Sequence, residues 1–552
     1  MSFKVYVENL NGRVIPSEEG GTIEDVLNQI KDELPYDVFL AKLDNAYRSL
    51  THVITHDSHI EFLDMRNHEA WLVYQNSLTL IFIKAVHDVL GKKVRVTVNN
   101  SLNKGVFITL THKMSQDDIN NVLARMQEIV DMNEPIRKEH MTKDQTMRMA
   151  KRSKQYEIVN LLENITNIDD IEIYTLLDER EIFYNFMVPS TGYVKKFGLK
   201  SYRNGVILRF PNPGDPTQLA PYIEQDLMYD AFSDANRWGQ LMGVNFVSDL
   251  NERIIFDNTK DLFLWQEALH EKKISEIADM IKDKKSRVVL ICGPSSSGKT
   301  TFAKRLCIHL GVNGFKTLYL GTDDYYKEKS ERTYGPDGEP DLESINAIDV
   351  NLFKTQIRDL LDGKEVDIPV YDFNKVGKVF GKRMTTLEKN QLIVIEGIHG
   401  MNNLLTDNIE ESEKFKIYIS PFTPVAIDHH NRISTTDARM LRRLVRDFKF
   451  RSYSAQETIK IWPKVRASED VNIFPYIESA DVFFNSNCIY ELAVLKKYAE
   501  PLLKRVRRTE KEYGDAQRML NFLKYIDPIY DDDYIASNSI IREFIGGSVI
   551  VH

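Results

Sequence analysis

The stretch GPSSSGKT at residues 293–300 decides the fold of the C-terminal part of this chain. It fits the pattern G-x-x-x-x-G-K-[ST] in full. It follows the apolar run VVLIC at 288–292 and precedes a helical stretch with Ala303, Leu306 and Leu310 on one face. In such a strand–loop–helix arrangement, glycines let backbone N–H groups approach phosphate oxygens, and the helix start adds a favourable dipole. A chance loop rich in glycine and serine is the alternative, but the register of strand, motif and helix argues against it.

The motif predicts a site for the phosphates of a nucleotide. Lys299 would reach the β- and γ-phosphates, and the Thr300 hydroxyl would bind Mg²⁺. The residues that we expect to contact the nucleotide here are Gly293, Pro294, Ser295, Ser296, Ser297, Gly298, Lys299, Thr300 and Thr301.

The strand pattern around the motif predicts a doubly wound parallel sheet. Near-continuous apolar runs alternate with helical stretches, as in a sheet that is covered by helices on both faces. The runs are 288–292, 317–321, 392–396, 416–420 and 482–485.

Size and composition indicate a folded protein of several domains. At 552 residues the chain is too long for one ordinary core, and 42% apolar with 28% charged residues excludes a disordered chain. A net charge of −9 argues against broad, non-specific nucleic-acid binding. The three cysteines, Cys292, Cys307 and Cys488, have neither metal-ligand spacing nor the density of a disulfide framework. No apolar run approaches a membrane span and the start lacks a signal-peptide core, so we expect a cytoplasmic protein without a membrane partner.

Two acidic residues follow the second strand of this pattern. Asp323 and Asp324 belong to TDDYYK at 322–327, at the carboxyl end of the strand, where open parallel sheets bind ligands. A carboxylate there can accept the proton of an attacking hydroxyl during phosphoryl transfer. Capping of a turn explains the same residues equally well on spacing alone.

A helix at 438–447 carries a stripe of four arginines. Arg439, Arg442, Arg443 and Arg446 lie at i, i+3, i+4 and i+7, with no acid among them. Charged helix faces are usually only solvated, but four guanidinium groups together favour a polyphosphate ligand.

Residues 287–500 resemble the uridine kinase and phosphoribulokinase family of P-loop kinases. Five landmarks stand in the family's order: the phosphate loop, TDDYYK at 322–327, IPVYDF at 368–373, VIEG at 394–397 and ARMLRRLVRD at 438–447. The resemblance implies an ATP- and Mg²⁺-dependent phosphotransferase that acts on the 5′-hydroxyl of uridine, cytidine or a related nucleoside.

The resemblance also implies roles for single residues. Asp323 would be the general base, with Lys299 and Arg446 as further catalytic residues, and Glu396 would hold Mg²⁺ together with Thr300. The substrate-binding residues would be Asp323, Tyr326, Glu343 for the ribose, Tyr371 against the base, and Phe373. The arginine helix would be a lid over ATP through Arg443, Arg446 and Arg451.

One position departs from the family pattern. Val376 stands where nucleoside kinases of the family carry a histidine that reads the base, and valine cannot donate a hydrogen bond to a base carbonyl. Base recognition is then rebuilt from other groups, such as Asn374 or Lys375, or relaxed. A kinase for another hydroxylated metabolite, such as a sugar phosphate, is therefore an alternative.

The N-terminal half shows a second resemblance. Residues 3–8 and 12–15 predict a hairpin turning at Asn11-Gly12; a helix follows from Thr22, and strand-like pieces at 40–45, 52–57 and 59–64 complete a small α+β unit. This unit resembles the TGS domain, a β-grasp module of threonyl-tRNA synthetases. VPSTGYVKKF at 188–197 is similar to a stretch of the synthetase editing domain.

The metal ligands of that editing domain are missing from this chain. The matching positions are Gln75, Thr79, Phe183 and Met187, which are non-ligands or poor ones. We therefore expect the fold without the hydrolytic metal chemistry. The expected domains are 1–64 (TGS-like), 65–255 (editing-like, α+β) and 270–552 (P-loop kinase with a helical tail).

The role of the N-terminal half is left open by the sequence. It could bind RNA, for example through the basic run at 148–154, sense a small molecule, or brace the kinase or its dimer; we expect a homo-oligomer. A nucleotide-gated regulator that binds RNA or the ribosome is the third functional alternative. The tail at 539–546 predicts a short amphipathic helix that ends at glycine and packs on the chain or on a partner subunit.

Overall fold

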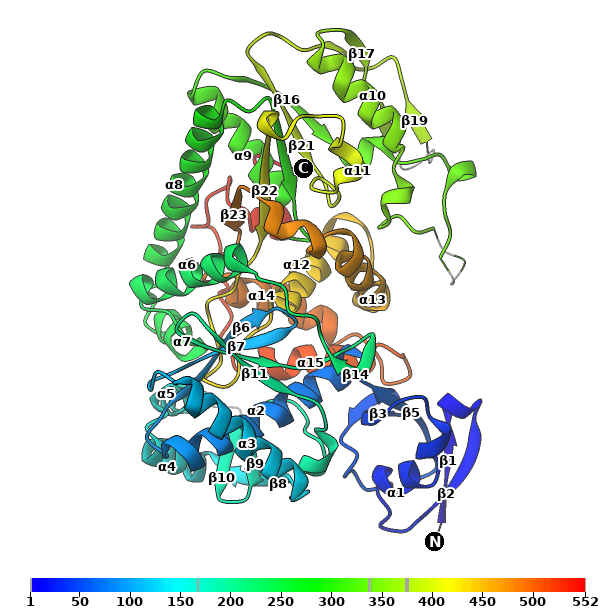
Figure 1. Cartoon of the computed structure of the whole chain (residues 1–552), viewed down its shortest axis with the longest axis vertical. Coiled ribbons are helices and arrows are strands. Elements are labelled where there is room, and N and C mark those ends of the chain that lie inside the picture. Colours follow the sequence, from blue (N-terminus) through cyan, green and yellow to red (C-terminus); the bar gives the residue numbers. More distant parts are fainter. Residues whose placement is uncertain (1, 166–167, 336–337, 339, 373–376, 552) are drawn as a thin grey trace.

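The computed structural model describes residues 2–165, 168–335, 338, 340–372 and 377–551 (Figure 1). Over these ranges no helix combines the length and the apolar character needed to cross a membrane. Phe373, expected to bind the substrate, Asn374 and Lys375, offered for base recognition, and Val376, which departs from the family pattern, lie outside the described residues.

The first unit is a five-stranded sheet in the order β2-β1-β5-β3-β4, with helix α1 against it. The predicted hairpin is confirmed: β1 and β2 pair antiparallel and turn at Asn11 and Gly12, which have the positive φ angles of 55° and 76° that this pair tolerates. Thr22 caps α1 as expected, with its side chain accepting from the backbone N–H of Asp25. The elements are β1 (Ser2–Val7), β2 (Arg13–Glu18), α1 (Ile23–Asn28), β3 (Val38–Leu43), β4 (Ala46–Arg48) and β5 (Ser58–Asp64).

The strand expected at 52–57 is wrong. This segment, which is described in full, forms only one isolated bridge, between Val53 and Thr22. It crosses the end of the sheet, where the Ile54 N–H donates to the Gly21 carbonyl. Ile54 of the segment is therefore buried without strand pairing, whereas Val53 is 42% exposed.

The second region packs the long helix α2 (His68–Leu90) against two antiparallel sheets, β11-β12-β7-β6 and β10-β9-β8. Apolar residues on every side of α2 explain its burial along most of its length. The other elements are β6 (Val96–Leu102), β7 (Gly105–Leu110), α3 (Gln116–Asp131), β8 (Arg137–Thr142), α4 (Lys143–Ser153), α5 (Tyr156–Asn164), β9 (Asp170–Leu176), β10 (Glu179–Ile182), β11 (Gly198–Tyr202), β12 (Gly205–Arg209), β13 (Pro211–Asn212) and β14 (Asp215–Leu219).

The C-terminal part contains the predicted parallel sheet. Its five strands run in the order β16-β21-β15-β22-β23, and every neighbouring pair is parallel. The strands are β15 (Val288–Cys292), β16 (Lys316–Gly321), β21 (Gln391–Glu396), β22 (Lys414–Ser420) and β23 (Val482–Asn485).

Helices cover both faces of this sheet, as Figure 1 shows. Val289 and Ile291 of β15 pack toward α8 (Lys260–Lys284) and α9 (Lys299–Val312), whereas Val288 and Leu290 pack toward α10 (Val350–Leu361). Burial on both faces accounts for the continuous apolar strands. The remaining elements are α6 (Asp226–Met242), α7 (Val247–Ile255), β17 (Glu365–Asp367), β18 (Val370–Asp372), β19 (Gly377–Val379), β20 (Met384–Thr386), α11 (Asn403–Thr406), α12 (Thr435–Phe450), α13 (Ala455–Asn472), α14 (Glu491–Leu503), α15 (Tyr513–Leu523) and α16 (Arg542–Ile545).

The largest apolar core joins the two halves of the chain. It contains Ile158 of α5, Leu250 of α7, Leu441 of α12 and Val494 of α14, all of them buried. The expected boundary between the domains at 65–255 and 270–552 therefore does not separate two independent apolar cores.

Candidate functional site

The phosphate loop lies between β15 and α9, and its backbone excludes larger residues. A Cβ atom on Gly293 would lie 2.2 Å from the Ile419 carbonyl oxygen. Gly298, the residue before α9, has a φ of 85°, in the left-handed region that favours glycine. Gly293 is thus required because the backbone of β22 lies too close for a side chain, and Gly298 because of its left-handed backbone conformation.

Polar groups of the loop suit an anionic ligand. Among the described residues, the buried hydroxyls of Ser296 and Ser297 find no hydrogen-bond partner. The Lys299 Nζ donates to the Pro294 carbonyl at 3.3 Å and lies 4.0 Å from Oε1 of Glu396. Unsatisfied donors and a lysine at the start of one helix, with a carboxylate from the neighbouring strand, fit a phosphate chain with its divalent cation.

Glu396 ends strand β21, which lies next to the central strand β15, beside the loop. Burial raises its pKa to about 7; Lys299 opposes this rise, whereas Asp323 and Glu543 add to it. The hydroxyl of Tyr319 donates to Oε2 of Glu396 at 3.2 Å. Glu396 and Thr300 are the residues that would hold a divalent cation here.

The two acids after β16 have different surroundings. Asp324 has structural partners: its Oδ2 lies 3.0 Å from Nη1 of Arg383, and its Oδ1 accepts from the Tyr371 N–H at 3.3 Å. Asp323 is exposed at the surface of the site, but desolvation by the surrounding protein raises the pKa of its carboxyl, while Lys299 is the first of the nearby groups that lower it. Asp324 is therefore held by structural partners, whereas Asp323 stands at the edge of the site.

The predicted acceptor residues gather around Asp323. Tyr326 hydrogen bonds to the Asp323 carboxylate, and its ring meets that of Tyr371 edge-on with centroids 5.7 Å apart. Arg332 donates to the Tyr371 hydroxyl. Burial raises the pKa of Glu343, whose carboxylate is close enough to Arg443, Asp323 and Lys299 to respond to their charges.

Two members of the predicted arginine stripe do not face a ligand. Arg439 forms a buried ion pair with Glu469 and donates to the Ser295 carbonyl at 2.9 Å. Arg442 pairs with Glu491 at 2.5 Å, and neither side chain is exposed. The prediction of one ligand-facing stripe is thus wrong for Arg439 and Arg442, because acids from α13 and the start of α14 neutralise them.

Of the remaining arginines, Arg443 contacts the loop as Arg439 does, whereas Arg446 and Arg451 contact Asp447. Arg443 donates to Oγ of Ser295 at 2.9 Å, and Arg446 donates to buried Asp447 at 2.7 Å. Arg451, with 52% of its side chain exposed, lies 3.7 Å from the same aspartate. Asp447 therefore gathers guanidinium groups at the end of α12, beside the loop.

Sequence reasoning missed Glu469, Glu543 and Tyr319. Oε1 of Glu469 accepts from the Ser295 N–H at 3.1 Å, and Glu543 binds Thr301 of α9. Glu469 lies 174 positions from Ser295, and no local pattern marks either glutamate. Only the folded chain brings them to the loop.

In the N-terminal half, the positions of the missing metal ligands are buried. Phe183 and Met187 are part of the apolar core of this half, and the Thr79 hydroxyl donates to the Gln75 carbonyl at 2.7 Å. The ring of His430 stacks on Phe183 with centroids 6.5 Å apart. A segment of the C-terminal part, which contains His430, thus packs over the position of Phe183.

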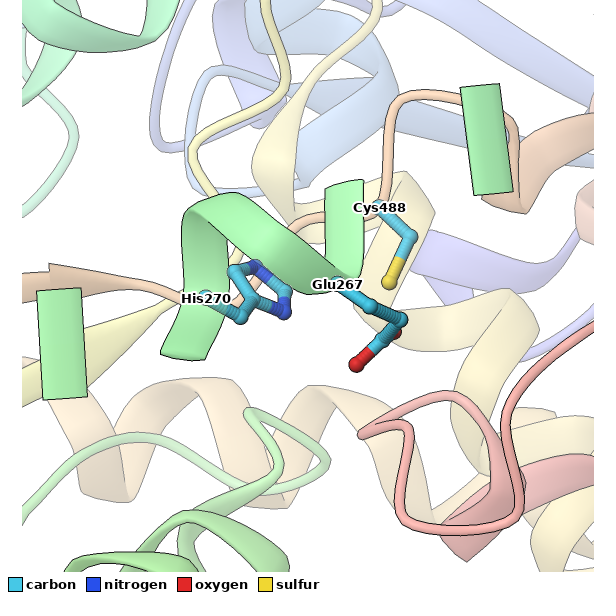
Figure 2. A group of neighbouring side chains, drawn as sticks. All are labelled: Glu267, His270 and Cys488. Carbon is cyan, nitrogen blue, oxygen red and sulfur yellow. The ribbon is translucent and has the colours of Figure 1, made fainter. Parts of the chain in front are cut away.

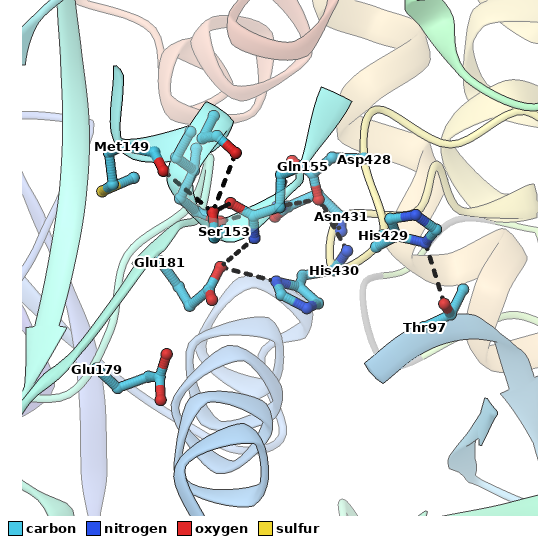
Figure 3. Close-up of polar contacts among 12 residues, drawn as sticks. Thr97, Met149, Ser153, Gln155, Glu179, Glu181, Asp428, His429, His430 and Asn431 are labelled. Carbon is cyan, nitrogen blue, oxygen red and sulfur yellow. Dashed lines mark hydrogen bonds and ion pairs between the residues drawn. The ribbon is translucent and has the colours of Figure 1, made fainter. Parts of the chain in front are cut away.

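That covering segment, residues 425–434, leads into α12 (Figure 3). His430 Nδ1 lies 2.9 Å from Glu181 of β10, and His429 bonds Thr97 of β6 at 3.0 Å. Burial opposes the charge on His430, but Glu181 reverses the effect and raises the pKa to about 9. The N-terminal half is therefore linked by charge and hydrogen bonds to the start of the arginine helix.

Comparison with known proteins finds two different similarities. The family described as Phosphoribulokinase / Uridine kinase family matches residues 288–491. A uridine kinase of Staphylococcus epidermidis is 29% identical over 197 residues, which cover 35% of this chain and 85% of that protein. A threonine--tRNA ligase of Syntrophotalea carbinolica is 24% identical over 200 residues of the N-terminal region, which cover 36% of this chain and 31% of the ligase.

Among solved structures, a possible uridine kinase from Bacillus stearothermophilus aligns with 39% of this chain and all of its own, at 20% identity and with a TM-score of 0.26.

Proposed function

We propose that this chain, whose C-terminal part contains a phosphotransferase domain of the phosphoribulokinase and uridine kinase family, transfers the γ-phosphate of ATP to the 5′-hydroxyl of uridine, cytidine or a related nucleoside. The observation that carries the proposal is the solvent-accessible Asp323 carboxylate at the carboxyl end of β16, near Lys299 of the phosphate loop. A phosphate site and a proton acceptor at one sheet edge are what transfer to a hydroxyl requires.

Asp323 takes the proton of the acceptor hydroxyl as the oxygen bonds to phosphorus, while the bond from the γ-phosphorus to the bridging oxygen breaks and ADP leaves. ATP supplies the phosphoryl group, and a divalent cation, Mg²⁺ in our proposal, shares the negative charge of the phosphate oxygens. Lys299 binds the phosphates, and Thr300 with Glu396 holds the cation. The raised pKa of Asp323 makes it a stronger base, once it is ionised, than an aspartate with the ordinary pKa.

The remaining groups orient the reactants and exclude water. Arg443, Arg446 and Arg451 cover the phosphates from the end of α12, and this cover limits hydrolysis of ATP. On the acceptor side, Glu343 binds the ribose hydroxyls and Tyr371 packs against the base.

For the N-terminal half, we propose that it braces the kinase part. The supporting observation is the contact of Glu181 and Thr97 with the segment that leads into α12. We propose no hydrolytic metal chemistry there, since Gln75, Phe183 and Met187 offer no suitable ligand set.

A panel of nucleosides, sugars and sugar phosphates tests the proposal, with Mg·ATP and coupled detection of ADP on the full chain. ADP formation that depends on uridine or cytidine supports it. Turnover with a sugar phosphate and none with nucleosides would instead favour the alternative drawn from Val376, a kinase for another hydroxylated metabolite. RNA binding with a steep salt dependence and no turnover would favour the regulator.

A further inference from the structure

The C-terminal tail, residues 531–551, runs back to the phosphate loop. Figure 1 shows this end of the chain beside the central sheet. Ile540 and Phe544 of the tail are fully buried in the core that contains α9. A Cβ atom on Gly298 would lie 2.5 Å from Cγ2 of Ile540, so the tail touches the loop directly.

One carboxylate of the tail binds the start of α9. Oε2 of Glu543 accepts from the Thr301 N–H at 3.1 Å and from the Thr301 hydroxyl at 2.7 Å. Thr301 is the third residue of the helix, so its N–H is one of the donors without a partner inside the helix. The phosphate loop uses donors of this kind to hold the α- and β-phosphates of a nucleotide. The Glu543 carboxylate therefore occupies a position at Thr301 where the oxygens of a nucleotide phosphate could bind.

Polar anchors hold the rest of the tail. The Ser539 hydroxyl donates to Oε1 of Glu267 at 2.5 Å, and the Ile550 carbonyl accepts from Nζ of Lys304 at 3.1 Å. Figure 2 shows Glu267 beside His270 and Cys488. A carboxylate oxygen of Glu267, a ring nitrogen of His270 and the sulfur of Cys488 all lie within 4.8 Å of one another. This group does not call for a cation, because Glu267 already pairs with Arg305 at 3.3 Å. It serves as a buried docking point for the tail.

We propose that the tail is an intramolecular competitor of the nucleotide, in which Glu543 occupies a phosphate position at Thr301 and must withdraw before ATP binds. The inference rests on the proposed function of the loop as an ATP site. Glu543 also brings a carboxylate near Glu396, so the phosphates would meet a cluster of like charges if the tail stayed in place. The apolar anchors Ile540 and Phe544 keep the competitor at high local concentration.

The first experiment measures binding of Mg·ATP by calorimetry without an acceptor, for the full-length wild type and Glu543→Gln. The amide keeps the shape of the side chain but loses the charge that the helix start favours. Only molecules with an open tail bind Mg·ATP, so the apparent Kd equals the intrinsic Kd divided by the open fraction. The variant should hold the tail less firmly, and we expect roughly tenfold tighter binding of Mg·ATP. The control is Asp533→Asn, which removes an exposed charge from the same tail and should leave the Kd unchanged.

The second measurement is amide hydrogen exchange of residues 539–546 with and without Mg·ATP. We expect the nucleotide to remove protection from this segment in the wild type. An unchanged or weaker Kd for Glu543→Gln, or a tail that stays protected at saturating Mg·ATP, would overturn the inference and leave the kinase proposal intact. Absence of Mg·ATP binding by both proteins would overturn the proposed function as well.

Discussion

Replacement of Asp323 by asparagine removes the proposed general base and little else. The amide has nearly the same volume, and its oxygen can still accept the hydrogen bond of Tyr326. Loss of a general base lowers the rate by about 10²–10⁴, which corresponds to roughly 3–5 kcal/mol of the barrier. We expect kcat for a nucleoside to fall by this factor while the Kd of Mg·ATP changes little.

Stability and pH dependence provide further tests of the same variant. Desolvation by the surrounding protein raises the pKa of Asp323, so ionisation costs more in the folded than in the unfolded chain, and the carboxylate lowers stability as the pH rises through its folded value. Asp323→Asn should therefore unfold at the same temperature as the wild type or higher. The acid limb of kcat/KM that belongs to Asp323 should disappear.

The assay is single-turnover or steady-state formation of ADP and nucleoside monophosphate at saturating Mg·ATP. The matched control is Asp324→Asn, which breaks the ion pair with Arg383 and should change KM more than kcat. A folded Asp323→Asn protein that keeps its rate within tenfold of wild type would refute the assignment. If Asp324→Asn lowered kcat more than Asp323→Asn does, Asp324 would be the general base and Asp323 the structural residue.

The remaining predictions concern the loop, the arginine helix and the link between the halves. Gly293→Ala should weaken Mg·ATP binding at least tenfold by calorimetry, because the added methyl group would lie 2.2 Å from a backbone oxygen; unchanged affinity would contradict this. Arg442→Met leaves Glu491 buried without its partner and should cost about 3–5 kcal/mol in urea unfolding, and a loss below 1 kcal/mol would show that the pair is unimportant. The pKa of His430 is raised to about 9, so its contribution to stability is complete below the unfolded value near 6.5 and is lost as the pH rises through about 9. Glu181→Gln should flatten the fall of melting temperature over this range, and an unchanged slope would refute the link.

Several parts of the fold could be predicted because they depend on local pattern. The five parallel strands are continuous apolar runs, and burial on both faces requires such runs. The hairpin at Asn11-Gly12 follows from the φ angles that these residues tolerate. The segment 52–57 carries the apolar pair Val53 and Ile54 but forms only one isolated bridge, and its sequence does not distinguish a turn from a strand.

The candidate site was predicted in part. The phosphate loop, Asp323 and Glu396 follow from motifs at strand ends, and the structure brings them together. Spacing alone could not separate Asp323 from Asp324, since the difference lies in Arg383, 59 residues away. The same is true of Arg442, whose partner Glu491 comes from another helix.

The phosphate loop is determined by the sequence itself, because its chemistry depends on consecutive residues: glycines that permit the backbone path, then a lysine and a threonine at the helix start. What occupies the loop's donors is decided only by the tertiary structure. Glu543 reaches Thr301 across 242 positions because apolar residues on both sides of it are buried against α9 and the sheet. Burial depends on surfaces that exist only after folding, so no pattern within the tail could have indicated that its carboxylate meets the phosphate loop.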